Sequence, residues 1–243
     1  MSKADRERAK RIVAAQQAAE RRRKVTLWTT IGVIAVLVVA GLIGWGVLAG
    51  QHKGKATVPS VAVDDGTAFK VGSGPVVLDL YEDFMCPICH EFENTDAATI
   101  KQWVAANKVT VRYHPVAILD RSSNGTQYST RSAGAAAAAA QDGKFIEFHD
   151  VLYQNQPQEN SDGLSDAKLI ELGRSVGLTG SAFADAVTGR TYDGWAAKAT
   201  DTFSQRGYTG TPTVLVNGKP VTDADGGPPD VATLTKAVTS AAG

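Results

Sequence analysis

The chain of 243 residues contains only two cysteines and two methionines. Two cysteines cannot staple a domain of this size with disulfides, and they cannot supply the four thiolates of an all-cysteine zinc site. The glycines follow neither the G-x-G-x-x-G nor the P-loop pattern, so no nucleotide site is predicted. Basic and acidic residues number 25 each, and no internal repeat is present.

The balanced total charge conceals an uneven distribution. Residues 1–24 hold nine basic and three acidic residues, whereas the remainder holds 16 and 22. Such a basic tail can bind nucleic acid, but it has no aromatic residues and directly precedes an apolar run. We therefore interpret 1–25 as a cytoplasmic tail whose charge sets the membrane orientation, and we expect no nucleic-acid partner.

Residues 26–49 form an apolar run without a charged side chain. As a helix, about 24 residues extend roughly 36 Å, enough to cross a hydrocarbon core of about 30 Å. A cleaved signal peptide is the alternative, although its apolar core normally spans about 7 to 15 residues. We predict a transmembrane helix at 26–49 in contact with the lipid bilayer, a tether at 50–67 and one extracytoplasmic domain at 68–243.

The two cysteines lie together in Cys86-Pro87-Ile88-Cys89, directly after a short apolar strand pattern. A cysteine that opens a helix faces unpaired backbone N–H groups and the positive end of the helix dipole, which favour the thiolate over the thiol. A second cysteine one turn later can attack a mixed disulfide formed by the first. The motif therefore predicts thiol-disulfide exchange.

Apolar periodicity predicts an α/β domain that is interrupted by a helical block. A strand at 76–83, a helix at 86–107 and a strand at 109–116 imply a parallel pair. Asn217-Gly218 indicates a type I′ hairpin, and a closing helix is expected at 229–241. The helical block at about 124–207 contains helical patterns at 128–141, 144–153, 166–176, 181–188 and 193–205, with Ser165 and Ser181 as expected N-caps and Gly177 and Gly207 as expected stops.

This order of elements resembles the DsbA-like thiol-disulfide oxidoreductases of the thioredoxin superfamily, of a membrane-anchored type that is common in actinobacteria. The resemblance covers about residues 68–242 and implies a thioredoxin fold with an inserted helical domain. The residues that carry it are Cys86-Pro87-Ile88-Cys89, Phe148-His149-Asp150 with Tyr153, and Gly210-Thr211-Pro212-Thr213.

The resemblance implies a mechanism and a set of partners. Cys86 is expected to be the exposed reactive sulfur and Cys89 the resolving thiol, with no cofactor beyond their disulfide and no metal. Pro212 is expected in the cis form, where the backbone of Thr211 can pair with an extended substrate. The substrates would be exported cysteine-containing proteins, and a quinone-linked membrane protein would reoxidise the pair.

The sequence departs from the family pattern at two places. Ile88 stands where the archetypal DsbA has histidine, which predicts a milder oxidant; His90 either compensates from the same helix face or simply faces solvent. Leu80 occupies the usual place of the buried acid. Strand alternation puts Glu82 on the same face, so Glu82 is the candidate base, and Asp79 on the other; solvation of these acids at the strand end is the alternative.

Other functions remain open at this point. The same fold can act as a disulfide isomerase or reductase, or as a non-catalytic peptide-binding module. Cys86-Pro87-Ile88-Cys89-His90 also satisfies the C-x-x-C-H pattern of c-type haem attachment, with His114 or His149 as a distal ligand, but Pro87 and the late Thr-Pro argue against it. A zinc site formed by the cysteines and two histidines matches no standard spacing.

Overall fold

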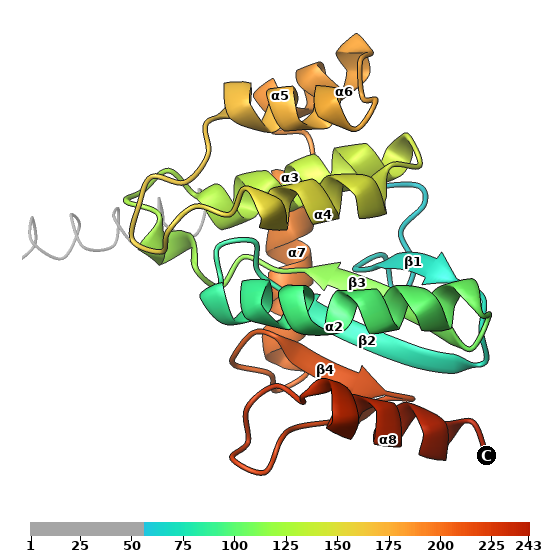
Figure 1. Cartoon of the computed structure of the whole chain (residues 1–243). Coiled ribbons are helices and arrows are strands. Elements are labelled where there is room, and N and C mark those ends of the chain that lie inside the picture. Colours follow the sequence, from blue (N-terminus) through green and yellow to red (C-terminus); the bar gives the residue numbers. More distant parts are fainter. Residues whose placement is uncertain (1–55) are drawn as a thin grey trace, which may run out of the picture. The chain divides into compact units, whose positions relative to one another are not determined.

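The computed structural model describes residues 56–243 (Figure 1). The predicted basic tail at 1–25 and the predicted transmembrane helix at 26–49 lie outside the described residues. Within 56–243, no helix combines the length and the apolar character that crossing a bilayer requires.

A five-stranded sheet in the order β1-β3-β2-β4-β5 forms the centre of the domain. β2 pairs in parallel with β3, as predicted, and antiparallel with β4. Six of the seven residues of β2 are buried, because helices cover both faces of the sheet. The sequence pattern does not predict β1, which is too short to display alternation. The strands are β1 (Phe69–Gly72), β2 (Val76–Glu82), β3 (Val109–Pro115), β4 (Thr213–Val216) and β5 (Lys219–Pro220).

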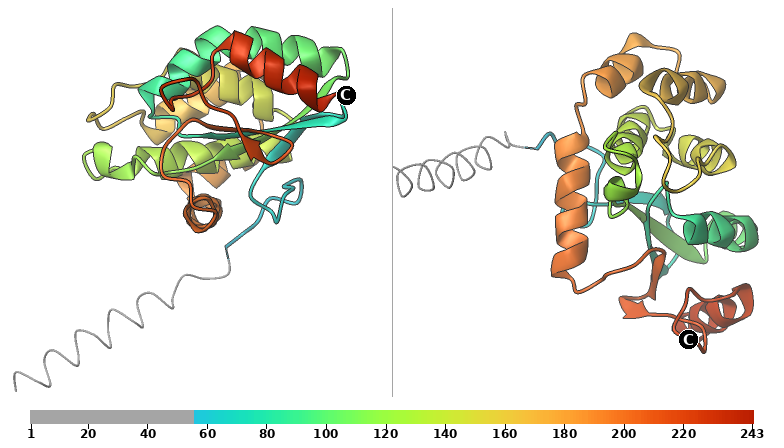
Figure 2. Two further views of the ribbon diagram at one scale, coloured as in Figure 1. Left: turned by 90° about the horizontal axis from the view of Figure 1, so that it is seen from below. Right: turned by 90° about the vertical axis from the view of Figure 1, so that its left-hand side faces the viewer.

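Helices α2 (Pro87–Ala105) and α8 (Val231–Ala241) cover one face of the sheet, and α7 (Asp193–Gln205) covers the other (Figure 2). The remaining helices form a layer beside the sheet, in which α3 packs against α4, α6 and α7. Small buried side chains at 135–140, all alanine, permit this close approach. The helices of this layer are η1 (Asp120–Ser122), α3 (Tyr128–Gln141), α4 (Phe145–Gln154), α5 (Asp166–Ser175) and α6 (Ser181–Thr188).

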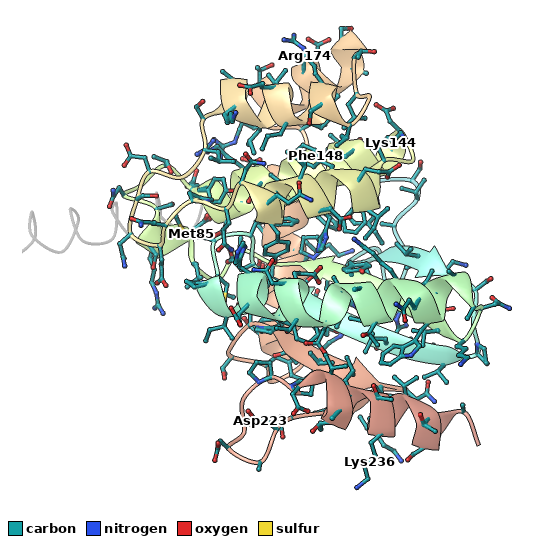
Figure 3. All side chains as sticks on the ribbon, in the orientation of Figure 1. Met85, Lys144, Phe148, Arg174, Asp223 and Lys236 are labelled. Carbon is teal, nitrogen blue, oxygen red and sulfur yellow. The ribbon has the colours of Figure 1, made fainter. Side chains whose placement is uncertain are left out.

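The side chains inside the helical layer are large and apolar. Phe148 of α4, labelled in Figure 3, packs edge-on against Phe183 of α6 with ring centroids 5.2 Å apart. Both rings are buried. Trp195 of α7 is also buried, and its ring centroid lies 4.9 Å from that of Phe69 in β1. Burial of these rings from water is the main stabilising contribution of the layer, and it joins the layer to the sheet.

Helix α2 ends at Ala105, two residues before its predicted end, and the N-caps of two other helices differ from the predicted ones. Ser165 caps α5 by accepting a hydrogen bond from the Lys168 amide. The N-cap of α6 is Gly180 rather than Ser181, because Ser181 already has helical geometry and its side chain makes no cap bond. Helix α8 begins two residues later than predicted, because the Asp230 side chain accepts from the Thr233 amide and defines the cap there.

The hairpin between β4 and β5 confirms the Asn-Gly signal. Asn217 has a φ of 46° and Gly218 a φ of 77°, which is the pair of positive values that a type I′ turn requires. The Asn217 side chain also accepts a hydrogen bond from the Val77 amide at 2.8 Å. The turn is therefore fastened to the neighbouring central strand.

The segment 56–67, assigned to the tether from its composition, contacts the domain instead. Thr67 is 2% exposed, and the Gly66 carbonyl accepts a hydrogen bond from the Trp195 indole at 2.7 Å. Asp64 binds Arg112 at 3.0 Å and Arg206 at 2.7 Å. Residues 56–67 are therefore part of the domain and not a tether. Composition did not reveal this, because the residues that they bind lie far along the chain.

Candidate active site

Both cysteines lie at the N-terminal end of α2. Cys86 is the N-cap residue with extended geometry, and Pro87 follows at the first helical position, where its missing N–H costs nothing. Cys86 is 5% exposed, Cys89 is 0% exposed, and both are free thiols. The preceding loop, marked by the buried Met85 in Figure 3, places the two sulfurs at one end of the sheet.

The surroundings of Cys86 favour its thiolate. A hydrogen bond from the Cys89 thiol is the largest effect that lowers the pKa of Cys86, and burial opposes it. Together with the Thr211 side chain and the backbone N–H groups of Cys89 and Ile88, it brings this pKa to about 6. These N–H groups are the orphan donors of the first turn of α2, so the thiolate takes the place of a capping oxygen.

Cys89 has the opposite environment. Burial raises the pKa of Cys89 well above its ordinary value, and the charges of Cys86 and Glu82 raise it further. Only one of the two sulfurs is therefore ionised near neutral pH. This asymmetry matches a reactive sulfur and a protonated resolving thiol.

The Thr211–Pro212 peptide bond is cis, as the resemblance implies. It places the Thr211 carbonyl oxygen 3.3 Å from the Cys86 sulfur, where it accepts from the thiol. A groove of about 380 Å³ runs away from this point and is lined by residues in 207–214, 220–222 and 226–228. Thr211 and Pro212 therefore lie both beside the Cys86 sulfur and in the wall of this cavity.

The loop that carries Cys86 is fixed by a buried carboxyl group. Asp83 accepts hydrogen bonds from the Met85 amide, the Leu119 amide and the Ser129 hydroxyl at 2.9, 2.9 and 2.7 Å. Burial raises the pKa of Asp83 to about 7 despite these donors. Because Ser129 belongs to α3, the helical layer holds the active-site loop directly.

A second polar group lies behind the cysteines. Glu82 is 3% exposed and its Oε2 lies 3.0 Å from Nε2 of His149, which belongs to α4. Glu93 of α2 completes the group, in which the oxygen and nitrogen atoms lie within 4.8 Å of one another. Burial and the charge of Glu82 raise the pKa of Glu93 to about 8, so a neutral carboxyl group lies beside Glu82 and His149 at neutral pH.

Glu82 and Asp79 lie on opposite faces of β2, as strand alternation predicts. Glu82 points toward α2 and α4, whereas Asp79 points to the opposite side, where it binds Arg112 and lies 3.1 Å from His114. These hydrogen bonds lower the pKa of Asp79 against the effect of burial. Asp79, Glu82 and Asp83 are all buried, so these acids are not simply solvated residues at the end of a strand.

The remaining predicted residues take different positions. Ile88 is 53% exposed beside Cys86 and leaves the rim of the site apolar. His90 is half-buried on α2, and its Nδ1 has no hydrogen-bond partner among the described residues. The groups with the largest effects on the pKa of Cys86 are Cys89, Thr211 and Ile88, and His90 is not one of them.

Sequence reasoning missed three contributors to the site. Gln156, in the loop after α4, donates to the carbonyl oxygens of Cys86 and Phe84 at 2.9 and 3.2 Å. Glu93 lies one turn after Cys89 on the same helix face, a spacing that was available in the sequence. His149 is part of the Phe148-His149-Asp150 segment, but only the fold brings it to Glu82.

Comparisons with known proteins agree with this geometry. Residues 72–239 match the sequence family described as thioredoxin. The reduced disulfide bond oxidoreductase DsbG of Mycobacterium tuberculosis superposes with a TM-score of 0.63 at 30% identity, over 74% of this chain and 89% of that one. Oxidised DsbA of the same organism superposes with a TM-score of 0.62 at 31% sequence identity. The superposition covers 72% of this chain and 93% of that one.

Curated relatives match through only part of their length. The serine/threonine-protein kinase PknE of M. tuberculosis is 32% identical over an alignment of 164 residues, and the alignment covers 63% of this chain and 28% of the kinase. The Na(+)/H(+) antiporter NhaA 3 of Salinispora tropica is 30% identical over 69% of this chain and 23% of its own length. This chain therefore spans about a quarter of these relatives. It belongs to the thioredoxin family, and its described domain is a DsbA-like thiol-disulfide oxidoreductase.

Proposed function

We propose that the protein is an extracytoplasmic oxidase that transfers the Cys86–Cys89 disulfide to cysteine pairs in exported proteins. The observation that carries the proposal is the asymmetry between a Cys86 thiol with a lowered pKa and a buried Cys89 thiol with a raised one. A stabilised thiolate favours the reduced form of the enzyme, and this makes its disulfide a better oxidant.

The size of this effect follows from the pKa of Cys86. Lowering it from about 8.5 to about 6 favours the reduced form by roughly 1.4 kcal/mol at pH 7, or on the order of 30 mV in a two-electron couple. This is a moderate shift, and it agrees with the exposed Ile88 in place of a polar donor. We expect a potential between those of strong oxidases and of reductants.

In the reaction, a substrate thiolate attacks the Cys86 sulfur and Cys89 leaves. A second substrate thiolate then attacks the substrate sulfur of the mixed disulfide and releases Cys86 as a thiolate. The substrate loses two electrons and the enzyme disulfide gains them. The groove beside Thr211 holds the extended segment while its sulfur meets Cys86.

The proposal includes a location and two further partners. The apolar run at 26–49 anchors the chain once in the cell membrane, and the basic residues before it keep the N-terminus cytoplasmic. A quinone-linked membrane protein reoxidises the pair. No metal and no cofactor beyond the disulfide takes part.

Refolding of a reduced, unfolded protein with several native disulfides tests the proposal. The oxidised wild-type protein is expected to form substrate disulfides in stoichiometric amounts, and Cys86→Ala to form none. Restoration of a scrambled substrate without net oxidation would instead establish an isomerase. Substrate binding without any exchange would establish a binding module, and a Soret band in the purified protein would establish a haem protein.

Labelling of whole cells tests the location. A membrane-impermeant maleimide is expected to modify reduced Cys86 in intact cells that express the full chain, and the protein is expected to stay in the membrane after carbonate extraction. Labelling only after lysis would contradict the proposed orientation.

A further inference from the structure

Three buried polar side chains behind the active site carry more hydrogen-bond acceptors than the protein uses. Glu82 of β2, Glu93 of α2 and His149 of α4 are 3%, 8% and 1% exposed. Within 56–243, the Oε1 atoms of both glutamates are buried and have no hydrogen-bond partner. Because an unpartnered buried oxygen costs free energy, two such atoms beside one imidazole indicate a place where a ligand can bind.

The donor atoms of these side chains are spaced as ligands of a single metal ion. One carboxylate oxygen from each glutamate and one ring nitrogen of His149 all lie within 4.8 Å of one another. Two ligands of a tetrahedral ion, each about 2.0 to 2.2 Å from it, are roughly 3.3 to 3.6 Å apart. Glu82 Oε2 is already 3.0 Å from His149 Nε2. Small rotations of the side chains are therefore enough to bring the three atoms to this spacing.

The imidazole of His149 has the surroundings of a histidine ligand. Its Nε2 lies beside Glu82, and its Nδ1 lies 3.5 Å from Asp150 Oδ1. A histidine that binds a metal through one nitrogen usually donates its other ring N–H to a carboxylate, which fixes the orientation of the ring. Asp150 in turn accepts from Lys101 Nζ at 2.6 Å. The Asp150 carboxylate thus holds His149 with Nε2 directed at Glu82.

Aromatic rings enclose the cluster on the side of His149. Their centroids lie 4.8 to 5.7 Å from that of the imidazole, and all four rings are buried. An apolar shell excludes water and strengthens the attraction between carboxylates and a cation. The rings are those of Phe84, Tyr113, Phe145 and Tyr153.

The ligand set indicates the class of ion. Ca²⁺ and Mg²⁺ prefer sites made of oxygen atoms alone, so a buried imidazole disfavours both. Zn²⁺ accepts histidine and glutamate together, and it often has three protein ligands and one water molecule. Neither cysteine belongs to the cluster, so the site needs no thiolate and can bind zinc while the two sulfurs form a disulfide.

Protons are the alternative means of neutralising these side chains. Burial and the charge of Glu82 raise the pKa of Glu93 to about 8. Against the effect of burial, the charges and hydrogen bonds of Glu93, Asp150 and Glu82 raise the pKa of His149. The three side chains then carry no net charge, and replacement of two protons by one dication keeps that balance. Metal content distinguishes the two arrangements.

We propose that Glu82, Glu93 and His149 form a binding site for one Zn²⁺ ion. The ion joins β2, α2 and α4, and so connects the helical insertion to the helix that carries both cysteines. It takes no part in the exchange of electrons, which belongs to the two sulfurs. Asp150 is a positioning residue that acts through His149. The inference does not depend on the proposed function.

The experiment adds zinc to the metal-free, oxidised full chain, because the disulfide removes both thiolates as competing ligands. After equilibrium dialysis near neutral pH, the wild type is expected to retain one zinc per chain by elemental analysis. Glu93→Gln and His149→Gln are expected to weaken binding at least about tenfold, and Asp150→Asn by about tenfold. Glu147→Gln, on the same helix as His149 but 42% exposed, is the matched control and should bind as the wild type does.

Thermal unfolding provides a second measurement. Zinc is expected to raise the Tm of the oxidised wild type and magnesium to leave it unchanged, because a ligand that binds only the folded protein stabilises it. If the variants of the buried ligands do not fold, Asp150→Asn decides, since its side chain is partly exposed. No zinc retained by the wild type, or equal retention in the wild type and the ligand variants, would overturn the inference and leave protons as the neutralising charges. Zinc binding by a protein that does not react with dithiothreitol would support this site and refute the proposed function.

Discussion

Gln156 donates a hydrogen bond from Nε2 to the carbonyl oxygen of Cys86, 2.9 Å away and 70 residues earlier in the chain. The same nitrogen donates to the Phe84 carbonyl at 3.2 Å. The Gln156 side chain, which belongs to the helical insertion, thus holds the backbone of Cys86 in place.

Replacing Gln156 with leucine removes both hydrogen bonds while keeping the size of the side chain. We expect the free energy of unfolding of the reduced protein to fall by about 1 to 2 kcal/mol. Urea denaturation measures this. The control is Asn155→Ala, because the Asn155 side chain at the end of α4 donates to the Val151 carbonyl of that helix and makes no other hydrogen bond within 56–243. Equal losses in the two variants would contradict the role of Gln156.

Ile88→His is expected to make the protein a stronger oxidant. The side chain is exposed beside Cys86, so the substitution leaves the core intact and adds an N–H donor near the thiolate. The alkylation midpoint of Cys86 should fall below about 6 by on the order of one pH unit, or about 1.4 kcal/mol. Ile88→Gln controls for polarity without charge. A midpoint no lower than in the wild type would refute the explanation.

The stability of the reduced protein relative to the oxidised protein is expected to rise with pH. The folded pKa of Cys86 is about 6, below its unfolded value of about 8.5. A lowered pKa contributes stability that is present above the unfolded value and is lost as pH falls through the folded one. Between pH 5 and 8.5 the difference in unfolding free energy should grow by about 3 kcal/mol.

Cys89 sets the upper pH limit of this measurement. Because its pKa is raised in the folded protein, the unfolded thiol ionises first as pH rises above about 8.5, and the stability of the reduced protein then falls. Denaturation of both redox forms at each pH cancels the titration of groups whose pKa does not depend on the charge of Cys86. A difference that stays constant from pH 5 to 8.5 would show that the Cys86 thiolate is not stabilised by the fold.

Asp64→Ala is expected to loosen the segment 56–67 from the domain. The side chain binds Arg112 and Arg206, and its loss leaves two half-buried guanidinium groups without this partner. We expect a decrease of about 1 to 2 kcal/mol in unfolding free energy, and earlier proteolysis within the segment. Asp65→Ala is the control, because the Asp65 side chain is 89% exposed. An unchanged Asp64→Ala protein would restore the tether interpretation of this segment.

Much of the fold was predictable because its signals are local. The patterns at 128–141, 181–188 and 193–205 coincide with α3, α6 and α7, since each of these helices buries one or more regular faces. Asn217-Gly218 fixed the hairpin through its own backbone preferences. By contrast, β1 is four residues long and is held by pairing with β3, which sequence periodicity does not show.

Some residues of the candidate site were also predictable from local signals, and others were not. Cys86, Cys89 and the Thr211–Pro212 bond were expected from motif and resemblance, and Glu82 from alternation along one strand. Gln156 and His149 could not be assigned, because their partners are 70 and 67 residues away and depend on how the helical insertion packs. The 56–67 segment was misread for the same reason, since its attachments are ion pairs and hydrogen bonds rather than an apolar stripe.

The 5% exposure of Cys86 restricts which clients can react. Such a small opening next to a backbone edge admits a sulfur on a slender, extended strand, whereas a thiol set in a compact surface cannot approach in line with the bond to be broken. Under the proposed function, the degree of folding of a substrate would therefore matter more than its side chains, and unfolded segments would react before folded ones.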